Sequence, residues 1–414
     1  MTYDIVIIGG GPAGMMAAAR ASERGARVLV LEKNESLGKK LLATGHGRCN
    51  LSNVFADDKN VMPAYGVNYK FLFSVFDQFG VEKTLDFFHG LGLKTKVEDN
   101  GRIFPESDRA LDVRLVLAEY LKKNNVTILF GSKVKSVIGK KNKIEKIVLE
   151  DGKEIVAKNY IIATGGKSYP GTGSTGDAYE WLAGLGHKII APRPALTSVI
   201  VKEKFVKDLE GTSLKDVGIS IFQNKKKIIS RIGDLLFTAD GLSGPVIIDL
   251  SRQIGALLSE SVFVKIDLFP AVMTDVLEKK IQNDFHNSNN KMFKNYLAGL
   301  VSPKLVPSII KLSGIFENKL INSISKEERK RLVLLLKEFC FTVSGLGGFE
   351  KAMVTAGGVD IKEVDPKTMR SRLYNNLFLA GEVLDLDGPS GGYNLQICWS
   401  TGYVAGENAV KSVS

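Results

Sequence analysis

Cysteine is scarce in this sequence. The chain of 414 residues contains 3 cysteines, Cys49, Cys340 and Cys398. An odd number of cysteines in so long a chain argues against a disulfide framework, and disulfides persist mainly in oxidising compartments. The sequence therefore predicts free thiols and a cytoplasmic location.

Long apolar runs are also absent. No run reaches the roughly 18 residues that a membrane-spanning helix needs, so we expect no membrane association. An apolar strand pattern begins almost at the first residue, in "MTYDIVIIGG". A secretory leader would need a charged start and a cleavage site there instead. We expect neither a leader nor a membrane anchor.

Acidic residues are the minority among the charges. The chain has 56 Lys and Arg against 45 Asp and Glu, a net charge of +11, and 44% of its residues are hydrophobic. This composition is typical of a globular protein, and the length exceeds what one compact core accommodates. We expect two or three domains, with a positive charge that bears on partners more than on the fold.

The N-terminal stretch "DIVIIGGGPAGMMAAARASERGARVLVLEK" matches a dinucleotide-binding motif. It predicts a strand at 5–8, a helix at 13–24 and a second strand at 28–31. Between them lies G-x-G-x-x-G, whose glycines allow a tight turn, the approach of a pyrophosphate and close helix packing. The acid after the second strand is placed to accept a hydrogen bond from a ribose hydroxyl. The residues concerned are Gly9, Gly11, Pro12, Ala13, Gly14 and Glu32.

A second G-x-G-x-x-G occurs at Gly171, Gly173 and Gly176. Pro170 precedes it directly, no strand leads into it, and no strand ending in an acid follows at the right distance. We interpret it as a loop and helix start that faces the nucleotide of the first motif, with Asp177 in the first helical turn. A flexible surface turn is the alternative.

Two further strands end in segments that return to the nucleotide site. One ends in "ATGG", residues 163–166, and the other, at 377–380, leads to Gly381 and Glu382. Before the first of them, residues 110–125 have helical spacing, and short strands separated by charged turns follow. After the second, a glycine-rich loop at 388–392 opens a long helix, whose dipole favours negative charge at its start.

Five motifs together resemble one protein family. They are "GGGPAG", "ATGHGRCNLSN", "ATGGKSYPGTGSTGDAY", "FTADGLSGPVI" and "LAGEVLDLDGPSGGYNLQICWSTG". Over essentially its whole length the chain resembles the bacterial NAD(P)/FAD-dependent oxidoreductase (flavoprotein) family that includes aminoacetone oxidase, a 3-dehydro-bile acid reductase and ribosomal RNA dihydrouridine synthase. The resemblance implies bound FAD and NADH or NADPH as electron donor, and it implies no metal. It leaves the substrate open, because members do different chemistry on one scaffold.

The resemblance also implies which residues hold FAD. In FAD proteins of this class, an acid after the late glycine holds the ribityl chain, and the start of the last helix faces the pyrimidine edge of the isoalloxazine. Beyond the first motif, the implied contacts are Lys33, Lys40, Gly45, Gly47, Arg48, Cys49, Asn50, Val134, Ala163, Thr164, Gly165, Gly166, Gly381, Glu382, Gly391, Gly392, Tyr393, Asn394 and Leu395.

The implied fold class is α/β, with a Rossmann-like, glutathione reductase-like FAD-binding domain that an inserted domain interrupts. The FAD-binding domain is expected at 1–193 and 361–414. The insertion is expected to hold a β-barrel or sandwich at 194–270, a basic helical subdomain at 271–338 and return strands at 339–360. Alternating segments such as "VGISIFQ" and helical spacing in "RLVLLLKEF" fit this order.

The loop "LLATGHGRCNLSN", residues 41–53, is the candidate catalytic segment. When a conjugated C=C accepts hydride, the neighbouring carbon needs a proton, so a general acid is expected near the flavin. Cys49 would be protonated at neutral pH and is one candidate, with His46 tuning it or sharing the task. The alternative for Cys49 is a packing role under the loop. Arg48 is expected to be structural or to pair with phosphate, and Asn50 to fix the loop.

Residues 278–337 carry 12 Lys and Arg against 5 Asp and Glu, and so hold 7 of the 11 net positive charges. We interpret this segment as a phosphate-facing module, with a solvated helical face as the alternative. The candidate phosphate contacts are Lys279, Lys280, Lys326, Arg329, Lys330 and Arg331.

Three functions fit these observations. The first is a flavin-dependent reductase of uracil in ribosomal RNA, which forms dihydrouridine and binds the RNA through residues 278–337. The second is a small-molecule oxidoreductase, either an enone reductase or an amine oxidase that uses oxygen. The third is a non-catalytic flavin-containing RNA-binding protein. The substrate and the oligomeric state stay open.

Overall fold

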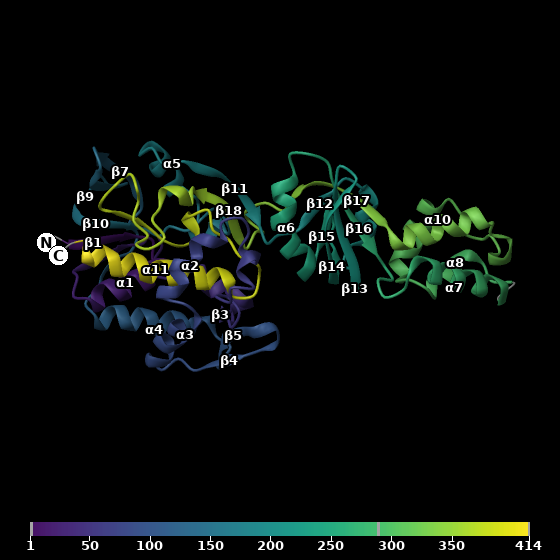
Figure 1. The fold of residues 1–414 in the computed structure, drawn as a ribbon, viewed down its shortest axis with the longest axis horizontal. Helices are drawn as coiled ribbons and strands as arrows, with labels where there is room; N and C mark the ends of the chain where they lie inside the picture. The colour runs from purple at the N-terminus through teal and green to yellow at the C-terminus, as the bar shows by residue number, and fades with distance from the viewer. Residues whose placement is uncertain (1–2, 288–289, 413–414) are drawn as a thin grey trace. The chain divides into compact units, whose positions relative to one another are not determined.

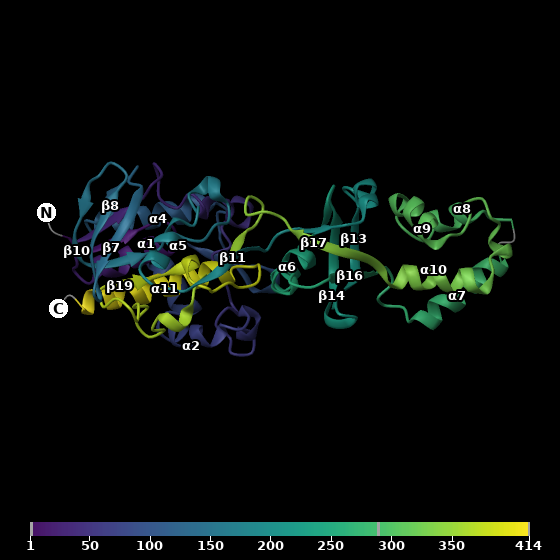
Figure 2. The ribbon, with the colours of Figure 1, turned by 90° about the horizontal axis from the view of Figure 1, so that it is seen from above.

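The computed structural model describes residues 3–287 and 290–412. The chain divides into two compact units, one formed by the residues before Ala195 and after Gly348 and the other by Ala195–Gly348. Both purple and yellow segments occur in the first unit in Figure 1 and Figure 2, because the two ends of the chain belong to it.

The first unit is built on a five-stranded parallel sheet. The strand order is β19 (Leu377–Leu379), β10 (Ala157–Ile162), β1 (Tyr3–Ile8), β2 (Val28–Leu31), β6 (Thr127–Leu129). Ile7 of the central strand lies opposite Val30 on one side and Ile161 on the other. Parallel sheets are covered on both faces, which explains why β2 is buried at every position.

Two helices pack against each other on this sheet. The helix α1 (Pro12–Glu23) follows β1, and the C-terminal helix α11 (Tyr393–Lys411) lies beside it (Figure 1). A β-carbon on Gly402 would lie 2.3 Å from the carbonyl oxygen of Ala13, and one on Gly406 would lie 2.4 Å from that of Ala17. These glycines therefore permit backbone contact between the first and last helices of the unit.

Smaller elements surround the sheet. Where the sequence predicts a helix over 110–125, the structure has α4 at Ala110–Lys123. The other helices are α2 (Tyr69–Gln78), α3 (Val81–Gly90) and α5 (Asp177–Gly184). The unit also contains two three-stranded antiparallel sheets, in the orders β7 (Val134–Lys140), β8 (Lys143–Leu149), β9 (Glu154–Ile155) and β3 (Ser52–Asn53), β5 (Arg102–Pro105), β4 (Thr95–Val97).

The second unit contains a closed barrel. Its strand order is β12 (Val199–Val201), β15 (Gly241–Ser243), β14 (Lys226–Phe237), β13 (Ser213–Gln223), β16 (Val262–Asp267), β17 (Phe339–Leu346). The strand β16 alternates as a barrel strand should, with Val262, Val264 and Ile266 buried and the residues between them partly exposed. The helix α6 (Pro245–Leu257) packs on the barrel.

The remaining helices of this unit share the core of the barrel. They are α7 (Thr274–Asn287), α8 (Phe293–Ala298), α9 (Val306–Ser313) and α10 (Lys326–Lys337), which gather beyond one end of the barrel in Figure 1. Leu277 of α7 and Leu336 of α10 belong to the same buried cluster as Val264 and Phe341 of the barrel. The sequence divided these parts at residue 270, whereas the structure gives them one continuous core.

The far boundary of the insertion also differs from the expected one. The sequence assigned residues 339–360 to return strands of the insertion. In the structure, the chain returns to the first unit at Phe349, and β18 (Val354–Val359) pairs there with β11 (Ile189–Ala195). The predicted fold class, a Rossmann-type sheet interrupted by a barrel, is confirmed. Among the described residues, every helix is too short or too polar to cross a membrane.

Candidate functional site

A cleft opens at the carboxyl ends of the parallel strands in the first unit. Ile8 of β1, Leu31 of β2 and Ala163 after β10 line it. Ligands of open α/β sheets bind at this edge. The cleft encloses about 1250 Å³, part of it open to solvent. Its lining includes residues from the turn after β1 and from the helix α11 (Tyr393–Lys411), at the other end of the chain.

The glycine turn of the first motif forms one wall of the cleft. Gly9 has φ +103°, and a β-carbon on Gly14 would lie 1.9 Å from the carbonyl oxygen of Gly9, so these two glycines allow the turn and the packing of α1. A β-carbon on Gly11, in contrast, would have no atom within 4 Å. The helix α1 begins at Pro12 without a side-chain cap, so its terminal N–H groups and its dipole suit an anion such as phosphate.

The acid after β2 is buried and held by the chain itself. Glu32 is 6% exposed. Its Oε2 accepts a hydrogen bond from the Gly10 N–H, and its Oε1 accepts from the backbone and side-chain N–H groups of Asn34, all at 2.8 Å. A carboxylate has about four acceptor sites, so Glu32 retains capacity for a hydroxyl donor in the cleft that it lines.

The second glycine-rich stretch lies at the same cleft. Gly173, Gly176 and Asp177 all line it. The Lys33 ammonium group donates to the side chains of Asp177 and Thr175, both at 2.6 Å. Burial works to raise the pKa of Asp177, but the hydrogen bonds from Lys33 and Thr175 outweigh it and hold the pKa below its usual value. The charged pair therefore fastens this loop to the end of β2.

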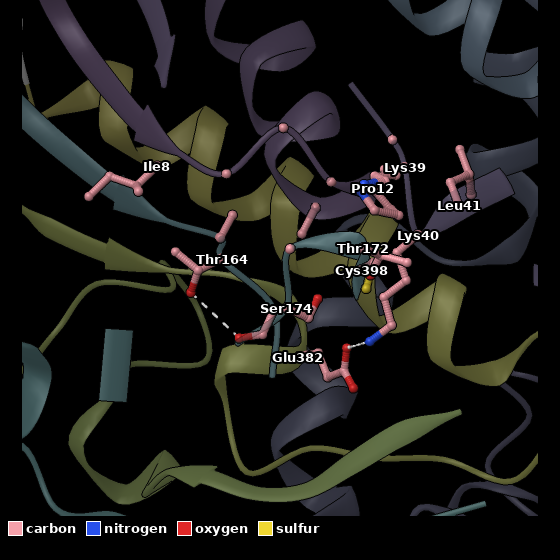
Figure 3. Close-up of a pocket in the computed structure, with 18 of the residues that line it drawn as sticks. Ile8, Pro12, Lys39, Lys40, Leu41, Thr164, Thr172, Ser174, Glu382 and Cys398 are labelled. Atoms are coloured by element: carbon pink, nitrogen blue, oxygen red, sulfur yellow. Dashed lines mark hydrogen bonds and ion pairs between the residues drawn. The ribbon is translucent and has the colours of Figure 1, made fainter. Parts of the chain in front are cut away.

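A polar network lies in another part of the cleft. Lys40 Nζ donates to Glu382 Oε2 and to Ser168 Oγ, both at 2.6 Å, and Figure 3 shows the first of these contacts. Glu382 Oε1 accepts from Ser168 Oγ at 2.8 Å and from the Thr355 N–H at 2.7 Å. The side chains of Lys40 and Glu382 are 20% and 16% exposed. The network therefore joins segments from both ends of the chain in a partly desolvated site.

The thiol of Cys398 on α11 lines the cleft near this network (Figure 3). Burial raises the pKa of the thiol to about 12, and the Glu382 carboxylate adds to the effect. The thiol therefore keeps its proton at neutral pH. Sequence reasoning missed Cys398, although it lies four residues after Asn394 and shares its helix face. That spacing, counted from the glycine loop, is the signal that would have found it.

The structure brings many of the predicted cofactor residues together. Those at the cleft are Gly9, Gly11, Pro12, Ala13, Glu32, Lys33, Lys40, Val134, Ala163, Thr164, Gly165, Glu382, Asn394 and Leu395. Lining residues that the sequence did not single out include Gly10, Asn34, Lys39, Thr44, Ser132, Ser174, Trp181 and Met353. Most of these lie within four residues of a predicted contact or of the second glycine-rich motif, so the sequence indicated their neighbourhood.

Other predicted cofactor residues do not line the cleft. They are Gly14, Gly166, Gly381, Gly391, Gly392 and Tyr393. A β-carbon on Gly166 would lie 2.4 Å from Thr355 Oγ1, and one on Gly392 would lie 2.2 Å from the carbonyl oxygen of Ser52. Close packing of protein segments explains both of these glycines.

The loop at 41–53 turns away from the cleft after Thr44. Gly45 and His46 both have left-handed backbone with φ +57°, and the Cys49 N–H donates to the Thr44 carbonyl at 3.0 Å. The chain therefore reverses here. Because of this turn, the candidate catalytic residue His46 does not line the cleft, and neither do the expected cofactor contacts Gly45, Gly47, Arg48, Cys49 and Asn50.

The side chain of Arg48 points to a carboxylate cluster. Its guanidinium group donates to Glu98 and, from Nε at 2.8 Å, to Asp108, and it lies 4.0 Å from the centre of the Phe104 ring. The hydrogen bonds that Arg48 donates to Glu98 and Asp108 raise its pKa above its ordinary value. Of the two expected roles, the geometry favours the structural one.

Cys49 and Asn50 lie at the base of the same turn. Cys49 is 0% exposed within the core of the first unit, and burial raises the pKa of its thiol to about 12. The side-chain oxygen of Asn50 is buried without a hydrogen-bond partner in the described part of the chain. His46 is exposed. The geometry favours the packing interpretation of Cys49.

Comparison with known proteins agrees with this architecture. The model of the HI0933-like protein Rossmann domain matches residues 3–408. The chain belongs to the HI0933-like flavoprotein family. It is 34% identical to the 3-dehydro-bile acid delta(4,6)-reductase of Clostridium scindens, across 98% of this chain and 99% of that protein. It is 33% identical to the ribosomal RNA dihydrouridine synthase of Haemophilus influenzae, across 96% of each chain.

Solved structures of flavoenzymes share the fold of this HI0933-like flavoprotein. The open conformation of a flavocytochrome c3 fumarate reductase matches 100% of this chain and 78% of its own, with a TM-score of 0.53 and 16% identity. At this identity the likeness concerns the fold alone.

Family membership confirms the predicted enzyme class, an FAD-dependent oxidoreductase, and does not support the non-catalytic hypothesis. The cleft fits FAD, because Gly11 faces open space, α1 presents an uncapped N-terminus and Glu32 retains acceptor capacity. When bound, FAD supplies hydride transfer. Within residues 3–287 and 290–412, no group of three His, Cys, Asp or Glu side chains could hold a metal ion.

The helices of the second unit expose most of the predicted basic residues. Those exposed are Lys279, Lys280, Lys326, Lys330 and Arg331. Arg329 differs, because its side chain is 12% exposed and its guanidinium group lies 3.7 Å from Glu278 Oε1. It joins α10 to α7, so we remove it from the predicted phosphate contacts.

Proposed function

We propose that this flavoprotein reduces a uridine in ribosomal RNA to dihydrouridine. When bound, FAD would supply hydride transfer to one carbon of the uracil C=C, with NADH or NADPH as the electron donor, and the neighbouring carbon would take a proton. The observation that carries this proposal is the positive surface of the second unit, where residues 278–337 hold 7 of the 11 net positive charges. Clustered exposed Lys and Arg suit a phosphate backbone. The Haemophilus influenzae relative, named for this reaction, supports it.

Within the cleft we assign the FAD contacts from the geometry. The turn at Gly9–Pro12 and the start of α1 would hold the pyrophosphate, where the space beside Gly11 is open. Glu32 would accept a hydrogen bond from a ribose hydroxyl. Lys40 and Glu382, joined by their ion pair, would hold another part of the cofactor.

A small-molecule enone reductase is the second candidate. The relative from Clostridium scindens, named as a bile acid reductase, is as similar to this chain as the relative named for ribosomal RNA. In that case the positive surface would have no part in substrate binding.

Nucleoside analysis of ribosomal RNA distinguishes the two candidates. We expect a strain that lacks this protein to lose dihydrouridine at one or more positions, and the wild-type gene to restore it. The Gly11→Val variant serves as a control that should not restore it, because its side chain would occupy the path of the pyrophosphate. Unchanged dihydrouridine in the deletion strain, together with reduction of a steroid enone by the purified protein, would establish the second candidate.

Charge reversal tests the surface directly. Changing Lys279, Lys280 and Lys330 to Glu should weaken binding to ribosomal RNA and flatten its salt dependence, with the FAD content unchanged. The matched control reverses three exposed lysines of the first unit, namely Lys59, Lys70 and Lys94. Equal losses in both triple variants would mean that only overall charge matters, and would count against a binding surface on these helices.

A further inference from the structure

An aromatic ring lies exposed among the basic helices of the second unit. Phe316 follows α9 and is 69% exposed. Two apolar neighbours, Met292 and Leu320, are 40% and 41% exposed. We call Met292, Phe316 and Leu320 the Phe316 patch.

Backbone contacts hold the Phe316 patch together. Met292 and Leu320 form an antiparallel bridge. The Lys294 N–H donates to the carbonyl oxygen of Glu317 at 3.0 Å, directly beside Phe316. The segment that carries the ring is therefore fixed against the start of α8, and Lys294 lies next to it.

The same segment is also fastened to α10. Arg331 Nε donates to the carbonyl oxygen of Ser313 at 3.4 Å, and Lys319 Nζ lies 2.7 Å from Glu328 Oε2. Phe316 lies between these two anchor points in the sequence. The segment that carries the ring is thus braced on both sides, at Ser313 by the exposed residue Arg331 and at Lys319 by Glu328.

The charge around the Phe316 patch is strongly positive. Residues 291–337 contain 10 Lys and Arg against 3 Glu. Of the acids, Glu328 is neutralised by Lys319, while Glu317 is exposed beside the ring. An exposed aromatic ring in a segment with more cations than acids matches the chemistry of an unpaired nucleotide, which offers a base to stack and a phosphate to pair.

We propose that the Phe316 patch is a stacking site for an unpaired base of the RNA substrate. The phenyl ring stacks on the base, and Lys294, Lys311 and Arg331 contact the flanking phosphates. This inference rests on the proposed function in ribosomal RNA. It adds that the second unit recognises a single-stranded segment, because bases within a duplex already stack on one another.

Fluorescence anisotropy with the FAD-loaded full chain tests the site. The probes are a fluorescein-labelled single-stranded oligouridylate and a blunt RNA duplex. Phe316→Ala should weaken binding of the single strand by about 5- to 150-fold and leave the slope of log K against log salt unchanged, because stacking releases no counterions. The double change Lys294→Gln and Lys311→Gln should instead reduce that slope by about 1.4. The matched control, Phe130→Ala, removes a ring that is 47% exposed in the first unit and should change nothing.

A tryptophan replacement reports contact itself. The F316W variant should keep the wild-type affinity, and its added indole fluorescence should be quenched by the single strand. Affinity of Phe316→Ala within about twofold of wild type, or an equal loss for single strand and duplex, would overturn the stacking site. If the lysine changes then still flatten the salt dependence, RNA binding stands and only the stacking site falls. If the wild-type protein shows no salt-dependent binding to RNA, the proposed function fails as well.

Discussion

Replacing Gly11 by valine should remove FAD and leave the fold intact. A β-carbon at Gly11 would have no protein atom within 4 Å, and the backbone there, with φ −78° and ψ −175°, is extended and open to valine. The free energy of unfolding should therefore change by less than about 1 kcal/mol. The added side chain would fill space that the protein leaves empty and that the pyrophosphate would use, so FAD affinity should fall by at least about tenfold, or about 1.4 kcal/mol.

The matched control for this prediction is Gly14→Ala in the same motif. A β-carbon there would lie 1.9 Å from the carbonyl oxygen of Gly9, so backbone must move and stability should fall by about 1–3 kcal/mol. The assay is the flavin-to-protein ratio of each purified variant, followed by urea unfolding of the flavin-free forms. Full flavin occupancy in Gly11→Val would refute the nucleotide assignment. A loss of stability in Gly11→Val equal to that in Gly14→Ala would refute the reasoning about open space.

Three further predictions concern the ion pair of Lys40, the reactivity of the cysteine thiols and the protonation of the buried His187. Lys40→Met should lower the free energy of unfolding by about 1–3 kcal/mol in urea titration, because Glu382, at 16% exposed, would lose its ion-pair partner; wild-type stability would contradict this. In the native protein Cys340 should be the first thiol alkylated at pH 8, as read by peptide mass spectrometry, because burial raises the pKa of Cys49 and Cys398 to about 12. Burial lowers the pKa of His187 in the folded protein, although the hydrogen bond with Glu363 acts in the opposite direction. Just below pH 6.5, the ordinary value, the unfolded chain therefore binds more protons at His187 than the folded protein does. Stability should then fall as the pH drops below that value, and His187→Gln should remove up to about 1.4 kcal/mol per pH unit of that slope; an unchanged slope would count against the buried neutral imidazole.

The parts of the cleft that the sequence predicted are those that local chemistry determines. The tight turn at Gly9, the strand ends and the acid at Glu32 follow from spacing within one strand, turn and helix. The network around Lys40 and Glu382 joins residues 342 positions apart. No spacing rule within one segment reveals such a pair, so only the resemblance placed the two residues at one cofactor.

The course of the loop at 41–53 could not be predicted, because distant partners determine it. Glu98 and Asp108 draw Arg48 outward, and the Leu51 carbonyl accepts a hydrogen bond from the Trp399 indole at 2.9 Å. These contacts, with the hydrogen bond from the Leu51 N–H to the carbonyl oxygen of Ile103 in β5, hold the loop against β5 and α11 after it leaves the cleft. The glycines that indicate close approach to a cofactor also suit a reversal of the chain, and the sequence does not distinguish the two uses.

The same reasoning leads to a last prediction, for Cys49. A proton donor must reach the substrate, yet Cys49 is 0% exposed and the chain reverses before it, whereas the thiol of Cys398 lines the cleft. Cys49→Ala should therefore retain FAD, accept hydride from NADPH and pass it on at a rate within about twofold of wild type. Its cost should be in stability, about 1 kcal/mol for the small cavity that the lost sulfur leaves. Stopped-flow measurement of flavin reduction and reoxidation by substrate, run beside Cys398→Ala, separates the steps. If Cys49→Ala were reduced normally, stayed folded and failed to reoxidise with substrate while Cys398→Ala turned over, Cys49 would be the donor and its buried position would open during turnover.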